Sequence, residues 1–152
     1  MTVVLSLTQG DLATSLRDHL EHKGYQVSIS KDNYAESLEV TAVKDRESLI
    51  IEGIWETLLP AEQTITYAIG KIVKRMNKPD PWVDYGLAIP KSYFKALKNF
   101  EAGGLENLKL HLFIVENIYT LTHLNSKTTL ELVKHLKENN LSTMPIWGIN
   151  YE

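Results

Sequence analysis

Two glutamates in neighbouring β-rich runs are the residues whose types and spacing could do chemistry in this sequence. Glu39 lies in the run Leu38–Val43. Glu52 lies in the run Ser48–Ile54, after a short polar turn. A polar turn between two such runs predicts a β-hairpin. Because residues two apart on a strand point to the same face, Glu52 and Ile54 would both face Glu39. The pattern predicts a pair of carboxylates on one surface, with an apolar third corner.

The elements that must position this pair follow from the spacing of apolar residues. Helical spacing predicts helices at Asp11–Lys23, Pro60–Met76, Lys91–Glu101 and Thr128–Asn139. Apolar and β-branched runs predict further strands at Tyr25–Ile29, Trp82–Ile89, Leu108–Val115 and Ile118–His123. Strand–helix–strand units in this order predict an α/β fold with a mixed central sheet and helices on both faces.

Length and composition limit the class of protein. A chain of 152 residues predicts one domain over residues 1–152, with a C-terminal helix and an apolar tail from about residue 125. The net charge of -3 argues against a protein that coats nucleic acid. The absence of cysteine excludes disulfides, thiolate zinc sites and thiol nucleophiles, and fits a cytoplasmic location. No apolar run approaches the roughly 20 residues of a membrane span, so we expect no membrane partner.

The predicted hairpin resembles the core of the PD-(D/E)XK (restriction-endonuclease-like) nuclease superfamily. In that family an acidic residue opens one strand and a Glu-x-Lys motif lies on the next. Glu39 falls at the position of the family's aspartate, and Leu38 replaces the usual proline. Glu52 matches the glutamate, whereas Ile54 stands where the lysine belongs. The chain is therefore similar to a degenerate member that lacks the motif lysine.

The resemblance extends beyond the hairpin and covers the chain from about Asp11 to His123. Gln63 lies on the following predicted helix, which carries a glutamine in many members. Tyr85–Pro90 and Leu110–Val115 are similar to the next two strands. The resemblance implies a three-layer restriction-endonuclease-like fold, with a degenerate catalytic site formed by Glu39, Glu52 and Gln63.

In active members of the family the two carboxylates hold Mg²⁺ or Mn²⁺, and the lysine orients or activates water. The resemblance thus implies Glu39 and Glu52 as metal ligands if the site is active. Isoleucine cannot replace the lysine, and loss of one such donor costs about a hundred- to a thousandfold in rate. Some members supply the lysine from the neighbouring helix, where Lys71 and Lys74 lie here. Lys71 is two turns beyond Gln63, about 12 Å along the helix axis, which places it unfavourably for this role.

Two groups of basic residues are candidates for contact with a nucleic-acid backbone. The first lies at the end of the second predicted helix and the second on one face of the third: Lys71, Lys74 and Arg75, and Lys91, Lys95 and Lys98. The alternative is that lysines near helix C-termini complement the helix dipole and keep the surface soluble.

The remaining polar and aromatic signals favour structural roles. The five histidines are scattered and lack the spacing of a helical zinc site. Trp55, Trp82 and Trp147 could stack on bases, but aromatic residues in such surroundings are more often core or interface anchors. The apolar tail Leu141–Tyr151 needs a cover, either on its own domain or in a homodimer, and we expect the homodimer.

The sequence leaves three functions open. The first is a non-catalytic, nuclease-like protein that serves as an accessory of DNA processing or of mobile-element systems. The second is a metal-dependent nuclease with a relocated lysine. The third is a protein-interaction or assembly module without a nucleic-acid role. Salt-dependent binding to nucleic acid would separate the first from the third, because phosphate contacts weaken steeply with salt.

Overall fold

The computed structural model of the chain describes residues 7–30, 36–76, 80–100, 104 and 107–139. Its elements follow the predicted order of helices and strands. They are α1 (Gln9–His22), β1 (Gln26–Ser30), β2 (Leu38–Lys44), β3 (Glu47–Gly53), α2 (Ala61–Arg75), β4 (Val83–Pro90), η1 (Lys91–Asn99), β5 (His111–Asn117), β6 (Thr120–Leu124) and α4 (Ser126–Asn139).

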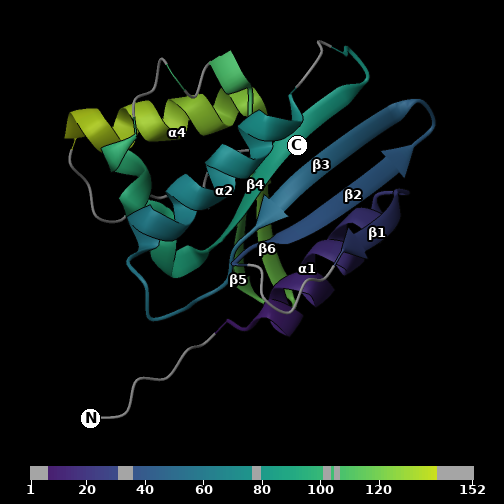
Figure 1. Ribbon diagram of the computed structural model, residues 1–152, viewed down its shortest axis with the longest axis horizontal. Coiled ribbons are helices and arrows are strands. Elements are labelled where there is room, and N and C mark those ends of the chain that lie inside the picture. The colour runs from purple at the N-terminus through teal and green to yellow at the C-terminus, as the bar shows by residue number, and fades with distance from the viewer. Residues whose placement is uncertain (1–6, 31–35, 77–79, 101–103, 105–106, 140–152) are drawn as a thin grey trace.

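The six strands form one mixed sheet in the order β1-β2-β3-β4-β5-β6. β4 is parallel to both of its neighbours, β3 and β5, and the other three pairings are antiparallel. Figure 1 shows α1 on one face of this sheet and α2 and α4 on the other. The predicted α/β class, with a mixed sheet between two helical layers, is confirmed.

Helix α1 begins and ends at residues suited to those positions. The Thr8 hydroxyl accepts a hydrogen bond from the Asp11 backbone N–H, and the Asp11 carboxylate accepts one from the Thr8 N–H. This reciprocal capping box satisfies two backbone donors that the first turn leaves free. Past the other end, Gly24 has a φ of 94°, a backbone conformation that L side chains rarely adopt. The helix therefore starts two residues before the predicted Asp11 and stops before the predicted glycine.

The apolar residues of the sheet divide into two clusters, one under each helical layer. The cluster on the α1 face includes Leu12, Leu16, Leu20, Leu38, Val40, Ile51 and Phe113. The cluster on the opposite face includes Ile54, Ile65, Ile72, Leu87, Ile89, Leu112, Ile114, Val133 and Leu136. Side chains on a strand alternate between faces, so consecutive residues of β5 enter different clusters. This is why Leu112–Val115 is a continuous buried run, as expected for a strand covered on both sides.

Two predicted elements differ from the observed ones in type or by three residues at their start. Lys91–Asn99 is a 3₁₀ helix, where an α-helix over Lys91–Glu101 was expected. Strand β5 begins at His111 and not at Leu108, because Lys109 has a φ of 51° and turns the chain just before the strand.

Glycine at position 86 is required by the close approach of a ring. A Cβ there would lie 2.9 Å from Cε2 of Phe113 and 3.3 Å from Cγ1 of Ile51. We expect Gly86→Ala to lower the free energy of unfolding by about 1–3 kcal/mol, because the buried ring has to shift. Gly70→Ala is the matched control: it meets nothing within 4 Å and should be neutral or slightly stabilising. Urea denaturation of both variants checks this, and equal stabilities would contradict the packing argument.

The predicted apolar tail Leu141–Tyr151, with Trp147, lies outside the described residues, so the homodimer stays a prediction. Trp55 is partly buried against the cluster on the α1 face, whereas Trp82 is half-exposed beside Arg46. Among the helices of the described residues, none combines the length and the apolar character that a bilayer crossing needs.

Candidate carboxylate site

The predicted pair of glutamates meets across the hairpin. Glu39 of β2 and Glu52 of β3 are direct partners in the antiparallel register. Their neighbours Leu38, Val40 and Ile51 belong to the cluster on the α1 face, so by alternation both glutamates face α2. The convergence of the two carboxylates on one surface of the sheet is confirmed.

A guanidinium group lies between the two carboxylates. Arg75, in the last turn of α2, places Nη1 against Oε1 of Glu39 and Nη2 2.7 Å from Oε1 of Glu52. The Glu52 side chain is fully buried, whereas those of Arg75 and Glu39 are 25% and 33% exposed. One fixed positive charge thus serves two facing negative charges that would otherwise repel each other.

Glu52 is further held by the residue just before β2. The Ser37 hydroxyl donates a 2.8 Å hydrogen bond to Oε2 of Glu52, and both groups are buried. Oε1 accepts no hydrogen bond of good geometry from the described residues, despite its short distance to Arg75. That contact is therefore an ion pair without hydrogen-bond alignment, and Oε1 keeps unused acceptor capacity.

The environment shifts the pKa values of both partners of this ion pair upward. Burial raises the pKa of Glu52, and the Ser37 hydrogen bond and the charges of Arg75 and Lys71 offset only part of the rise. Burial acts to lower the pKa of Arg75, but its hydrogen bond to Glu39 and the charge of Glu52 outweigh this and raise it. Arg75 therefore stays charged, and Glu52 depends on it to remain ionised.

Ile54 follows β3 on the same face and is fully buried. It packs in the cluster under α2 that contains Ile65 and Ala68, and its backbone N–H donates a 2.9 Å hydrogen bond to the Ala88 carbonyl. The third corner is thus apolar, as the sequence predicted. Position 54 therefore supplies no charged side chain that could bind or activate a water molecule.

The expected place of Gln63 next to the glutamates is wrong. Gln63 is exposed in the first turn of α2, whereas the residue that contacts both glutamates is Arg75, twelve residues later. At 1.5 Å per residue this separation is about 18 Å along the helix axis. Lys71 lies one turn before Arg75 and is close enough for its charge to lower the Glu52 pKa. The last turns of α2, and not its first, reach the site.

The two basic groups do not form one continuous surface of equivalent residues. Arg75 is engaged by the glutamates, and the Lys71 ammonium lies 5.7 Å from the centre of the Tyr67 ring. A 3₁₀ helix repeats every three residues, so Lys95 and Lys98 align on η1 but Lys91 is a third of a turn away. Lys91 forms a 3.0 Å ion pair with Glu116. Lys91 and Lys95 nevertheless line one hollow of the surface, so a shared basic face on η1 stays a prediction.

No three His, Asp or Glu side chains within the described residues are grouped so that they could hold a metal ion. The site offers two carboxylates, and a hydrated divalent cation can bind through one or two such ligands. Arg75 lies against the oxygen atoms that a cation would need. In this arrangement the two glutamates are compensated by the protein's own charge.

Three of the five histidines converge at a second place, on the α1 face of the sheet. His111 of β5 has Nδ1 3.0 Å from Nε2 of His123 of β6. The other nitrogen of His123, Nδ1, is 3.5 Å from Nε2 of His19 and 3.4 Å from Nζ of Lys23. The His123 ring stacks on Phe113, with ring centres 4.1 Å apart. This three-histidine cluster (His19, His111, His123) was missed because its members are up to 104 residues apart.

One set of neutral tautomers accounts for the contacts of two of the three histidines, His111 and His123. His111 Nε2 lies 3.5 Å from the Asp84 carboxylate and donates to it, which leaves Nδ1 to accept from His123 Nε2–H. His123 Nδ1 then accepts from Lys23. Burial, followed by the charge of Lys23, lowers the pKa of His19 to about 4 and that of His123 to about 3. Burial also lowers the pKa of His111, although Asp84 opposes it.

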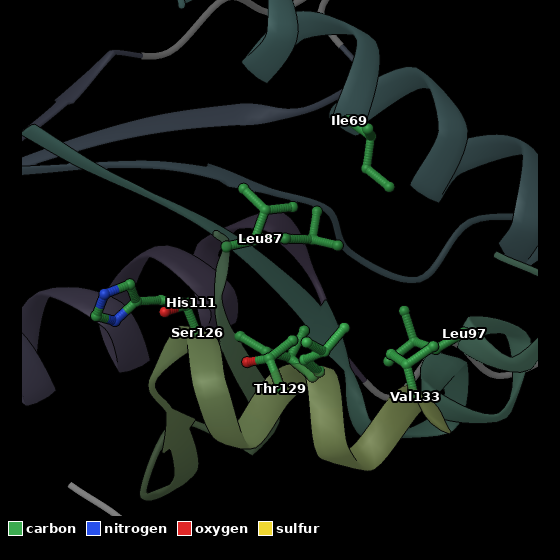
Figure 2. A pocket seen from close by; sticks show the side chains of 10 residues that line it. Ile69, Leu87, Leu97, His111, Ser126, Thr129 and Val133 are labelled. Atoms are coloured by element: carbon green, nitrogen blue, oxygen red, sulfur yellow. The ribbon is translucent and has the colours of Figure 1, made fainter. Parts of the chain in front are cut away.

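An apolar cavity between α2, α4 and the sheet is too small to bind a substrate. Figure 2 shows aliphatic side chains such as Ile69, Leu87 and Val133 around it, with the His111 ring pointing away. Its volume is about 20 Å³, close to the space that one water molecule needs. It is a packing defect of the core and has no geometric link to the carboxylate pair.

Comparison with known proteins identifies no match to this chain. No protein-family model, no curated protein and no solved structure matches the chain.

Proposed function

We propose that this chain is a non-catalytic, nuclease-like protein that serves as an accessory of DNA processing or of mobile-element systems. The observation that supports the absence of cleavage is the position of Arg75, whose guanidinium lies against both carboxylates. A cation bound there would have to displace a charge that is already paired. The buried Ile54 supports the same proposal, because it supplies neither the charge nor the proton donor of the motif lysine.

The second candidate function is metal-dependent cleavage with a relocated lysine. The observation that favours it is Lys71, whose charge acts on Glu52 from the neighbouring helix. In that case a phosphate of the substrate would draw Arg75 away from the glutamates, a cation would bind them, and Lys71 would face the reacting phosphate. This candidate requires Mg²⁺ or Mn²⁺.

The third candidate function, an assembly module, is favoured by exposed apolar side chains near α2. Tyr67 and Val73 are 40% and 49% exposed on α2, and Leu58 is 81% exposed in the segment before it. Exposed apolar side chains of this kind can contribute to a surface that meets another protein. The net charge of -3 is compatible with this role.

A cleavage assay separates the first two candidates. The protein is incubated with single- and double-stranded DNA and RNA in the presence of Mg²⁺ or Mn²⁺, beside Glu52→Ala and the surface control Glu131→Ala. We expect no cleavage above background from any of the three, because Arg75 is paired with both carboxylates and no lysine stands at position 54. Metal-dependent cleavage that is lost in Glu52→Ala and kept in Glu131→Ala would overturn the proposal in favour of the relocated lysine.

Salt dependence of binding then separates the first candidate from the third. A protein that contacts phosphates loses affinity steeply with salt, and each lost contact lowers the slope by about 1. We therefore expect Lys74→Glu and Lys95→Glu to lower the slope, whereas Lys134→Glu on α4 should leave it unchanged. Binding without salt dependence, or no binding, would favour the assembly module.

A further inference from the structure

The three-histidine cluster (His19, His111, His123) connects α1 to the far edge of the sheet. His19 of α1 and Lys23, the residue that caps the end of the helix one turn later, both approach Nδ1 of His123 at 3.4 to 3.5 Å. His123 lies on β6, the edge strand, and pairs with Phe113 of β5 in the strand register. The cluster is thus a polar contact at the margin of an interface that is otherwise made by apolar residues of α1.

The charged groups around the cluster disfavour an additional proton on its imidazole rings. The charged and titratable groups in and around it are Asp18, His19 and His22 of α1, Lys23 at its C-cap, Asp84 of β4, His111 of β5 and His123 of β6. Among the described residues, Asp84 is the carboxylate that contacts a ring of the cluster, and that ring belongs to His111. A proton on His123 would set a second positive charge 3.4 Å from the Lys23 ammonium, on a ring stacked against Phe113.

We propose that the three-histidine cluster is an acid-sensitive latch, in which neutral imidazoles hold α1 on the sheet and proton uptake by His19 and His123 releases the helix. The relay Asp84–His111–His123 fixes the neutral tautomer that accepts from Lys23. A proton added at Nδ1 of His123 removes that acceptor and turns the contact into a repulsion. The latch is independent of the carboxylate site, which lies on the other face of the sheet.

The direction of the pH dependence follows from proton linkage. A solvent-exposed imidazole has a pKa of about 6.5, whereas with α1 docked the pKa values of His19 on the helix and His123 on β6 are about 4 and about 3. The released state therefore binds more protons below about pH 6.5. Docking of α1 is complete above that pH and weakens as the pH falls toward the docked values.

The latch is open to solvent on one side. A groove of about 410 Å³ runs between α1 and the β5–β6 turn and reaches His19, with the 90% exposed Tyr119 at its rim. Protons and water therefore have access without unfolding. Release of the helix would uncover Leu12, Leu16 and Leu20, which are fully buried against the sheet when α1 is docked.

Hydrogen exchange of the full chain tests the latch. Protection factors of α1 amides and α4 amides are measured at several pH values from 7.5 to 5. We expect protection in α1 to fall by up to about a thousandfold over this range, because each of the two protons that are taken up on release multiplies the released population by about ten per pH unit below 6.5. Protection in α4 should change less. An equal loss in α1 and α4, or none in α1, would overturn the proposal.

Matched variants remove the titrating groups and keep the packing. His123→Phe retains the ring stack on Phe113, and His19→Gln retains a polar side chain; the double variant should keep α1 protection nearly constant with pH. His135→Gln on α4 is the control and should behave as the unaltered protein. If the double variant does not fold, nuclear magnetic resonance titration of the unaltered protein decides: midpoints of His19 and His123 near 6.5 would overturn the latch, and midpoints below 5 would support it.

Discussion

Arg75→Met should be among the most destabilising single substitutions at the carboxylate site. It leaves Glu39 and Glu52 facing each other across the hairpin without a counter-charge, and Glu52 is fully buried. Breaking a buried pair by removing one partner costs about 3–5 kcal/mol, and the partial exposure of Arg75 and Glu39 reduces this to about 2–4 kcal/mol. For a chain of this size the loss corresponds to about 4–16 °C in Tm.

The loss in Arg75→Met should also depend on pH, with a defined sign. Without the guanidinium, the folded-state pKa of Glu52 rises further above its value in the unfolded chain. At Glu52 the folded state then binds more protons than the unfolded state, so the contribution of Glu52 to the stability of the variant is greatest at low pH and is lost as the pH rises. The difference in Tm between the variant and the unaltered protein should therefore be larger at pH 8 than at pH 5.

Two controls separate charge compensation from a general effect on α2. Lys74→Met changes the adjacent, exposed residue and should cost less than about 0.5 kcal/mol. Glu52→Gln in the Arg75→Met background removes the uncompensated charge and should recover part of the stability. Equal stabilities of Arg75→Met and Lys74→Met would show that the ion pair does not hold the hairpin to the helix.

Arg75→Met also provides a test of whether the carboxylates of Glu39 and Glu52 can hold a cation. A ligand that binds only the folded state raises Tm in proportion to RT ln(1 + [L]/Kd). With Arg75 removed, we expect millimolar Mn²⁺ to raise the Tm of Arg75→Met more than that of the unaltered protein. An equal response in both would indicate that the glutamates do not form a cation site even when they are free.

The hairpin and its acidic pair could be predicted because strand geometry is local. Alternation and a four-residue turn are sufficient to place Glu39 opposite Glu52, and the register bears this out. The role of Arg75 could not be predicted in this way, because it depends on how α2 crosses the sheet. Helical spacing identifies which residues share a face of α2, but it does not show which turn lies over β3.

The three-histidine cluster was even harder to predict from local sequence patterns than the role of Arg75. His19, His111 and His123 come from a helix and two strands that are distant in the sequence. The sequence does contain a weak signal, since His123 occupies a position in β6 whose neighbours Thr122 and Leu124 are buried on the opposite face. Alternation thus assigns His123 to the α1 face once that face is known to be covered. Only the packing of α1 shows that it meets two other imidazoles.

Ile54→Lys should also be strongly destabilising, although it introduces the lysine of the PD-(D/E)XK motif that the hairpin sequence resembles. Position 54 is fully buried among apolar side chains under α2, and a charged group there lacks water. We expect a loss of about 3–5 kcal/mol, because the lysine must either lose its proton or disturb the packing of α2. Ile54→Met conserves the volume and should cost less than about 1.5 kcal/mol. Chemical denaturation of the two variants measures the difference.

The arrangement of the site further predicts that Ile54→Lys and Arg75→Met are coupled. Position 54 lies two residues beyond Glu52 on the same face, and Oε1 of Glu52 has unused acceptor capacity. With Arg75 present, a lysine at 54 competes for a carboxylate that is already paired; without Arg75, it becomes the counter-charge. The loss of stability in the double variant should therefore be smaller than the sum of the two single losses by about 0.5–3 kcal/mol in a double-mutant cycle.

If the nuclease kinship holds, metal-dependent cleavage should arise in the double variant and not in Ile54→Lys alone, since only the former has both carboxylates available to a cation. Additive losses, or cleavage by Ile54→Lys with Arg75 in place, would contradict the role of Arg75 as the charge that keeps this site closed to metal.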